Sequence, residues 1–387
     1  MINDVSAKPG RRPVRTTGRD PLFDVLKGLM MVWIVWGHLA LYRVVDYIPG
    51  TPWMANAKIG MNMPVFFLLA GAFARRTFER ASFGKLVARV VSFLWPMAAF
   101  GVVFALVLCL EGKGGGLSWF VQFVPRRLLR GHWYLRTFAA VYACSAILWR
   151  CLPRSWMKAI GFVALYAALI FLPAPVACFV RWTDIRPMVH MLPYFAFGLA
   201  LPCSIDEVRR HTRFAVPCLL FFLAVVFLEG NSSTNGMNFW NVSMEWRDVL
   251  LSGRGLLTLL GRTAVGLSGS LAALFVLDRL LARFPRTANQ LAVFGTTTLG
   301  VYVLHEWPLM QIGAAKLPWL PLPEWTRWPV AIGWFLVCHA AVMGIRRLSA
   351  TRIFFFGDEK RLASAIDRIS SLVAALVRPD KRGEKGA

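Results

Sequence analysis

The chain has 387 residues, of which 57% are hydrophobic, and a mean hydropathy of +0.54. This composition excludes an ordinary soluble domain and is typical of a polytopic membrane protein. The formal net charge of +24 does not indicate nucleic-acid binding, because Lys and Arg lie between the apolar segments and in the tails, where anionic inner-leaflet lipids account for them. The seven cysteines show neither CxxC nor Cys/His spacing, so we expect no metal site.

Apolar runs of membrane-spanning length recur along the chain and predict an all-α fold, a polytopic membrane helix bundle of about ten transmembrane helices. The expected spans are residues 22–42, 57–74, 86–110, 133–149, 156–172, 188–201, 214–228, 256–281, 291–314 and 328–344. The sixth is short and is interrupted by Pro193.

Basic residues divide the chain into three parts and indicate its orientation. Residues 1–20 form a basic N-terminal segment, residues 21–347 the membrane domain, and residues 348–387 a basic tail. Alternate loops are richer in Lys and Arg, which places both chain ends in the cytoplasm. Apolar residues recur at helical spacing in the tail and predict an amphipathic helix on the inner membrane face; they are Leu362, Ile366, Ile369, Val373 and Leu376.

Three ionisable residues occupy the first span, where a lipid-facing helix has no use for them. Asp24 lies one turn before Lys27, and His38 follows on the same helical stripe, ~16 Å further along the axis. The alternative interpretation is that Asp24 and Lys27 anchor the helix at the membrane interface and that His38 is a packing residue. An imidazole inside a membrane favours proton chemistry, and we interpret Asp24 as a structural partner of Lys27.

A further cation, Arg89, lies about one turn inside the third span, where an unpaired charge is costly. The expected orientation places Arg89 near the inner face of the membrane, where Lys27 also lies. If the two side chains converge there, they form an anion-binding mouth suited to a phosphorylated donor.

Histidines of four spans fall in the outer half of the expected bundle: His38, His132, His190 and His305. His132 and Arg136 are one turn apart at the outer end of the fourth span, where aromatic anchoring at the interface is the alternative explanation. In the ninth span, Tyr302, His305 and Glu306 share one helix face. This clustering favours a reaction centre in the outer half of the membrane.

Several segments together resemble the integral-membrane acyltransferases called the acyltransferase-3 family. The first span resembles the family's opening signature of a carboxylate, a base, a glycine and a histidine, here Asp24, Lys27, Gly28 and His38. The second resembles its Met-Pro-x-Phe-Phe…Gly motif, the fourth its Trp-Tyr/Phe-Leu motif, and the ninth its Leu-x-x-Tyr-x-x-His ending. Residues 194–198 resemble its aromatic-Gly element. The order of these motifs along the chain carries the resemblance.

The resemblance implies an acyl-CoA donor that enters from the cytoplasm, with His38 as the catalytic residue and with Lys27 and Arg89 holding the donor or shaping its path. The sequence also departs from the family pattern. Lys27 stands where Arg is commoner, Ala70 precedes Gly71 where Ser is usual, and Arg89 alone represents a pair of arginines. These departures bear on donor binding more than on the fold.

We therefore expect a multi-pass inner-membrane (plasma-membrane) O-acyltransferase that acts on a sugar hydroxyl of a cell-surface or exported glycan, or on a lipid-linked sugar, with acetyl-CoA or another acyl-CoA as donor substrate. His38 and Lys27 are the predicted catalytic residues, and Lys27 and Arg89 the donor-binding ones. The further candidates are Asp24, His132, Arg136, Tyr302 and His305, of which Arg136 is placed to stabilise an oxyanion.

A transporter or flippase of an anionic or lipid-linked glycan is the alternative function, in which the same charges bind the substrate. Transporters often carry repeats or paired broken helices, and we identify neither in the sequence. A purely structural membrane subunit would not need histidines gathered in one half of the bilayer.

Overall fold

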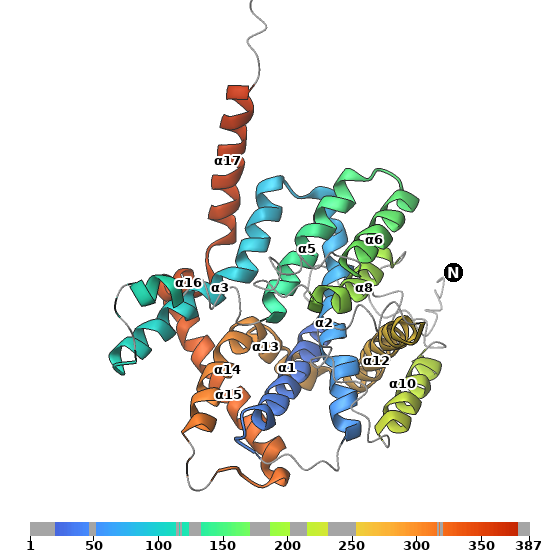
Figure 1. The fold of residues 1–387 in the computed structure, drawn as a ribbon, viewed down its shortest axis with the longest axis vertical. Coiled ribbons are helices and arrows are strands. Elements are labelled where there is room, and N and C mark those ends of the chain that lie inside the picture. The colour runs from blue at the N-terminus through green and yellow to red at the C-terminus, as the bar shows by residue number, and fades with distance from the viewer. Residues whose placement is uncertain are drawn as a thin grey trace, which may run out of the picture.

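The computed structural model describes residues 20–45, 52–113, 116, 118–123, 133–170, 186–201, 215–230, 253–315, 317 and 320–377. Helices dominate these residues, and the only strand-like pairing within them is an isolated parallel bridge between Val45 and Leu322. The helices, labelled in Figure 1 where there is room, are α1 (Pro21–Leu41), α2 (Pro52–Arg80), α3 (Phe83–Leu110), α5 (Trp133–Cys151), α6 (Ser155–Ile170), α8 (Arg186–Ala200), α10 (Ala215–Gly230), α12 (Gly253–Arg283), α13 (Pro285–Gly295), α14 (Thr298–Ala314), η2 (Glu324–Thr326), α15 (Arg327–Arg347), α16 (Ser349–Phe356) and α17 (Glu359–Val377).

These helices confirm the predicted all-α class and coincide with the predicted spans, with one correction. The ninth predicted span, residues 291–314, is two helices, α13 and α14, separated at Thr296 and Thr297. The hydroxyls of the two threonines donate to the carbonyl oxygens of Val293 and Phe294. Local side-chain bonds of this kind compete with the helical ladder, and a continuous apolar pattern does not reveal them.

Four described helical segments are long and apolar enough to cross a membrane: Pro21–Leu41, Phe83–Leu110, Leu259–Arg283 and Glu324–Arg347. Three shorter helical segments are also apolar: Ser155–Leu169, Met188–Ala200 and Val216–Phe227. This composition is that of a membrane protein. The number of ten spans and the cytoplasmic position of both ends stay predictions.

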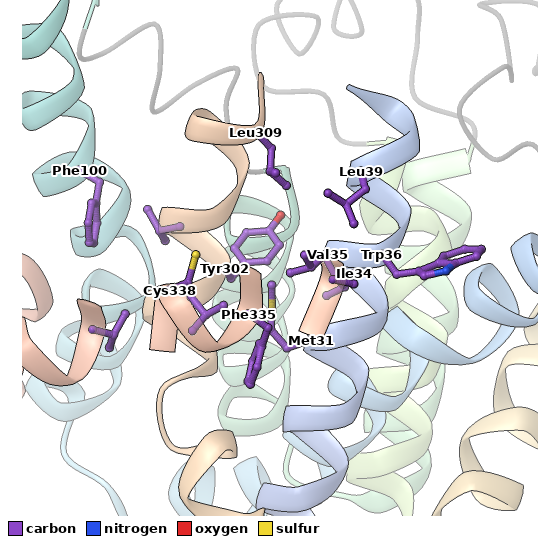
Figure 2. Close-up of a cluster of buried hydrophobic side chains, with 14 of the residues drawn as sticks. Met31, Ile34, Val35, Trp36, Leu39, Phe100, Tyr302, Leu309, Phe335 and Cys338 are labelled. Atoms are coloured by element: carbon purple, nitrogen blue, oxygen red, sulfur yellow. The ribbon is translucent and has the colours of Figure 1, made fainter. Parts of the chain in front are cut away.

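The first helix lies inside the bundle and contacts α2, α12, α13, α14 and α15. Figure 2 shows one buried cluster that it helps to form, in which α1 side chains meet side chains of α3, α14 and α15. The labelled members are Met31, Ile34, Val35, Trp36, Leu39, Phe100, Tyr302, Leu309, Phe335 and Cys338. Close van der Waals packing of this kind holds helices together in a membrane. It fixes the rotation of α1 about its axis, and hence the direction of His38.

Two glycines allow backbone contact at both ends of α1. A Cβ atom on Gly295 of α13 would overlap the carbonyl oxygen of Asp24, and one on Gly313 of α14 would overlap the carbonyl oxygen of Tyr42. Small residues permit such close approach between membrane helices. The polar residues near both ends of α1 are therefore held in place through the backbone.

Glycines of two motifs play the same part between α2 and α8. A Cβ on Gly71 would overlap the carbonyl oxygen of Phe195, and one on Gly198 would overlap that of Leu68. These contacts give the two motif glycines a packing role. Ala70, which stands where the family pattern usually has Ser, is next to Gly71 and therefore lies in this helix-packing region.

The predicted tail helix is present as α17. Its first half runs alongside the start of α3, and its second half extends beyond the bundle at the top of Figure 1. Ile369 and Leu372 are 60% and 65% exposed there. The position of this helix relative to the membrane stays a prediction. Of the predicted N-terminal segment the structure describes Asp20, which caps α1 by accepting a hydrogen bond from the Leu22 amide at 2.9 Å.

Candidate active site

His38 of α1 and His305 of α14 contact each other through their rings. Nδ1 of His38 lies 2.7 Å from Nε2 of His305. The ring planes are within 2° of parallel and the ring centroids are 4.9 Å apart, so the short nitrogen–nitrogen distance is an edge-to-edge hydrogen bond. His305 is fully buried, whereas His38 is partly exposed. The structure thus leaves the His38 imidazole partly exposed and pairs it with a fully buried one.

The surroundings of His305 assign the protons of both rings. Its Nδ1 lies 2.8 Å from the carbonyl oxygen of Tyr302 and 3.1 Å from that of Val301. Carbonyl oxygens only accept, so Nδ1 carries a proton, and in the neutral ring Nε2 then accepts. His38 therefore donates from Nδ1, and its lone pair lies on Nε2. This is the tautomer that can act as a base at Nε2.

Aromatic rings connect the histidine pair to α5 and α2. The Tyr302 ring centroid lies 5.8 Å from that of His305 and 5.2 Å from that of Tyr134 in α5. Tyr134 makes edge contacts with Phe66 and Phe67 of α2, at centroid distances of 5.8 and 5.4 Å. Such edge geometries are the favoured ones for aromatic pairs. A continuous series of ring contacts therefore connects His38 to the motifs of the second, fourth and ninth predicted spans.

A tyrosine–glutamate pair lies beside the histidines. The Tyr42 hydroxyl donates to Oε1 of Glu306 at 2.6 Å, and the Tyr42 ring meets the His38 ring edge-on with centroids 5.8 Å apart. Tyr42, Glu306 and His38 are all partly exposed. Sequence reasoning missed Tyr42, although it stands four residues after His38, the spacing of neighbours on a helix face. Together these groups can bind and deprotonate a hydroxyl.

Asp24 and Lys27 form an ion pair at the other end of α1. Nζ of Lys27 lies 2.6 Å from Oδ1 of Asp24, and the side chains are 28% and 4% exposed. The partnership expected from their spacing is therefore present. Because Asp24 is buried and charged, it needs this cation, while Lys27 keeps an exposed part. The donor-binding role of Lys27 stays a prediction.

Arg89 lies near the start of α3 and pairs with the tail. Its Nη1 lies 3.0 Å from Oε2 of Glu359 in α17, and its side chain is 44% exposed. Lys27 and Arg89 thus each bind a carboxylate of this chain. A common mouth formed by the two cations stays a prediction.

The other predicted residues have different surroundings. Arg136 is half-buried on α5, and its oxyanion role stays a prediction. His132 lies outside the described residues. His190 of α8 lies near Arg262 of α12. Of the histidines gathered by the sequence analysis, the structure joins His38 and His305.

Arg327 is a buried arginine that contacts α1 and that was not predicted from the sequence. Arg327, the first residue of α15, is 3% exposed. Its Nε donates to the Trp36 carbonyl oxygen at 3.0 Å, and its guanidinium carbon lies 3.6 Å from the Trp36 ring centroid. Trp36 and His38 point to nearly opposite sides of the helix, so Arg327 supports α1 from behind the site. In the sequence it resembles an ordinary interfacial arginine.

Comparison with known proteins assigns the chain to a family. The family described as an acyltransferase domain matches residues 21–344. The chain belongs to the acyltransferase-3 family. It is also similar to the nodulation protein NolL of Sinorhizobium fredii (strain NBRC 101917 / NGR234), with 26% identity over 223 residues, which is 52% of this chain and 57% of NolL. The chain thus spans little more than half the length of that relative. No solved structure matches it.

The acyltransferase-3 match covers the histidine pair and both ends of α1. It ends inside α15, so α16 and α17 lie beyond it. The family and the apolar helices together identify a membrane protein of the acyltransferase-3 family, as the resemblance of the motifs predicted.

Proposed function

We propose that this membrane acyltransferase transfers an acetyl or other small acyl group from cytoplasmic acyl-CoA to a sugar hydroxyl of a cell-surface or exported glycan, in the inner membrane. The observation that carries the proposal is the bond from His38 to His305. Acyl transfer to a hydroxyl needs a base at the attacking oxygen. The bond supports that role, because it places the lone pair of His38 on Nε2.

The donor enters, in this proposal, at the end of α1 that carries Lys27. Lys27 and Arg89 supply positive charge for the phosphates of CoA. His38 lies ~16 Å further along the helix axis, so the phosphates and the thioester occupy different depths of the bundle. The exposed part of each cation supports this assignment, because the Lys27 and Arg89 side chains are 28% and 44% exposed and each has a surface that the phosphates can approach.

The transfer itself is direct. Nε2 of His38 takes the proton of the acceptor hydroxyl as the hydroxyl oxygen attacks the thioester carbonyl carbon. The carbon–sulfur bond breaks, the acyl group stays on the sugar oxygen, and the proton on Nε2 passes to the CoA thiolate. While His38 is positively charged, its Nδ1–H donates to His305, whose own Nδ1–H donates to the Tyr302 carbonyl oxygen. A hydrogen bond to a charged group is stronger than a neutral one, so the pair stabilises the imidazolium.

The acceptor sugar binds near Tyr42 and Glu306. A carboxylate accepts from sugar hydroxyls, and the Tyr42 hydroxyl holds this carboxylate 2.6 Å away with a defined orientation. The ring of Tyr42 against His38 brings the bound hydroxyl close to the base. Arg136 is our candidate for stabilising the oxyanion that develops on the thioester carbonyl.

Mass spectrometry of the purified surface glycan tests the proposal. A strain that lacks the gene should lose one acyl mass per modified sugar, and the mass difference identifies the acyl group. The wild-type gene should restore that mass, whereas His38→Ala should not, although the variant chain is inserted in the membrane at the normal level. Persistent acylation with His38→Ala would refute the role of His38. Loss of the whole glycan in the deletion strain would favour the transporter.

A further inference from the structure

The tail helix α17 lies beyond the acyltransferase-3 match and bonds to the start of α3 through two acidic residues. Asp367 accepts a hydrogen bond from the Gly84 amide at Oδ1, at 2.8 Å, and one from the Ser82 hydroxyl at Oδ2, at 2.7 Å. One turn further into α3, Arg89 pairs with Glu359 at 3.0 Å. The two carboxylates are eight residues apart, which places them on one face of α17. That face meets the positively polarised end of α3 and its arginine.

The packing at this contact is close and depends on a glycine. A Cβ on Gly84 would lie 2.6 Å from the carbonyl oxygen of Ala363 and would also overlap the Asp367 carboxylate. Any larger side chain at Gly84 therefore pushes α17 away from α3. The docked position of the tail is thus a specific contact between two helices.

The Arg89–Glu359 pair is at the same time easy to displace. The side chains are 44% and 27% exposed, and ion pairs that water reaches contribute little and are screened by salt. A ligand with several negative charges can compete with a single carboxylate for the same guanidinium. The phosphates of CoA are such a ligand.

We propose that α17 is an autoinhibitory helix: Glu359 occupies Arg89, the residue assigned above to the donor's phosphates, and the donor must displace this carboxylate to bind. The proposal rests on the proposed function, because it takes Arg89 as a donor ligand. In the resting protein α17 is docked and Arg89 is neutralised. When CoA or acyl-CoA binds, Arg89 turns to the phosphates and the hold of α17 on α3 weakens.

The test measures CoA binding to the detergent-solubilised full chain by calorimetry. Removing the charge with Glu359→Gln should lower the Kd of CoA about 1.5- to 5-fold, the range that an exposed ion pair supports. Gly84→Val, which keeps the charge and displaces α17, should lower the Kd as well. The matched control is Glu79→Gln, which removes the partner of Arg75 on α2, an ion pair whose side chains are 42% and 44% exposed, and should leave the Kd unchanged.

The outcomes separate the two proposals. If wild-type protein binds CoA and Arg89→Ala weakens the binding, but neither Glu359→Gln nor Gly84→Val strengthens it, then α17 is not autoinhibitory and the donor site stands. An equal gain from Glu79→Gln would also overturn the proposal, since the effect would then be one of net charge. If neither the wild type nor any variant binds CoA, both the donor assignment and the autoinhibition are wrong.

Discussion

Replacing His305 with two different amides tests how this residue acts on His38. The carboxamide of Asn overlays Nδ1 of a histidine, and that of Gln reaches the position of Nε2. His305→Asn therefore keeps a donor toward the Tyr302 carbonyl oxygen and loses the acceptor for His38. His305→Gln keeps an acceptor for His38 and loses the donor. The two variants remove the two halves of one relay.

The size of the effect follows from the bond that is lost. In the transition state His38 carries a positive charge, and a hydrogen bond to a charged group contributes about 1.5–3 kcal/mol. At 1.36 kcal/mol per tenfold change in rate, His305→Asn should lower kcat about 10- to 150-fold. His305→Gln should retain more activity than His305→Asn, because its side-chain oxygen can still accept from Nδ1 of His38.

The assay is acyl transfer from labelled acetyl-CoA to the glycan acceptor by purified protein in lipid nanodiscs, with kcat and KM determined separately. Both variants should keep the wild-type KM for acetyl-CoA, because the donor's phosphates bind at the other end of α1. If His305→Asn and His305→Gln lose activity equally, or if His305→Asn is the more active, the relay from Tyr302 through His305 to His38 is refuted.

Three further predictions concern packing, the buried carboxylate and acceptor binding. Gly313→Ala should lower the apparent Tm, because the added Cβ overlaps the Tyr42 carbonyl oxygen; overpacking of this kind destabilises a protein by about 1–3 kcal/mol. Gly333→Ala is the control and should not lower the Tm, because a Cβ there meets open space. Asp24→Asn should destabilise the solubilised protein by about 1–3 kcal/mol. This effect is smaller than the loss of a fully buried ion pair, because Lys27 is partly exposed. An unchanged Tm would contradict the pairing. Tyr42→Phe should raise the acceptor KM about 2- to 13-fold, the equivalent of one hydrogen bond, with kcat nearly constant; a wild-type acceptor KM would exclude Tyr42 from acceptor binding.

Local pattern was enough to predict the helices and the ion pair inside α1. Apolar runs located the helices, except that the ninth run covers two of them, because a helix in a membrane must be apolar along its length. Asp24 and Lys27 are neighbours by helical spacing alone, so their contact did not depend on the rest of the fold. The outer position of His38 stays a prediction, because it rests on the expected orientation of the chain.

Contacts between distant segments were beyond the reach of that reasoning. His38 and His305 are 267 positions apart, and periodicity does not say which two helices meet or how each is rotated. The break between α13 and α14 depends on two threonine hydroxyls inside an apolar run. The tail was predicted from its apolar face, whereas its acidic residues, Glu359 and Asp367, make the contacts with α3.

His38 is the proposed base for acyl transfer. The most direct measurement is acceptor-dependent release of CoA from acetyl-CoA by the nanodisc-embedded protein, with wild type and His38→Gln compared at equal protein and with CoA binding confirmed for both. Loss of a general base typically costs about 10²- to 10⁴-fold in rate, so we expect turnover to fall by that factor in His38→Gln with the Kd of CoA unchanged. Wild-type turnover by His38→Gln would contradict this role.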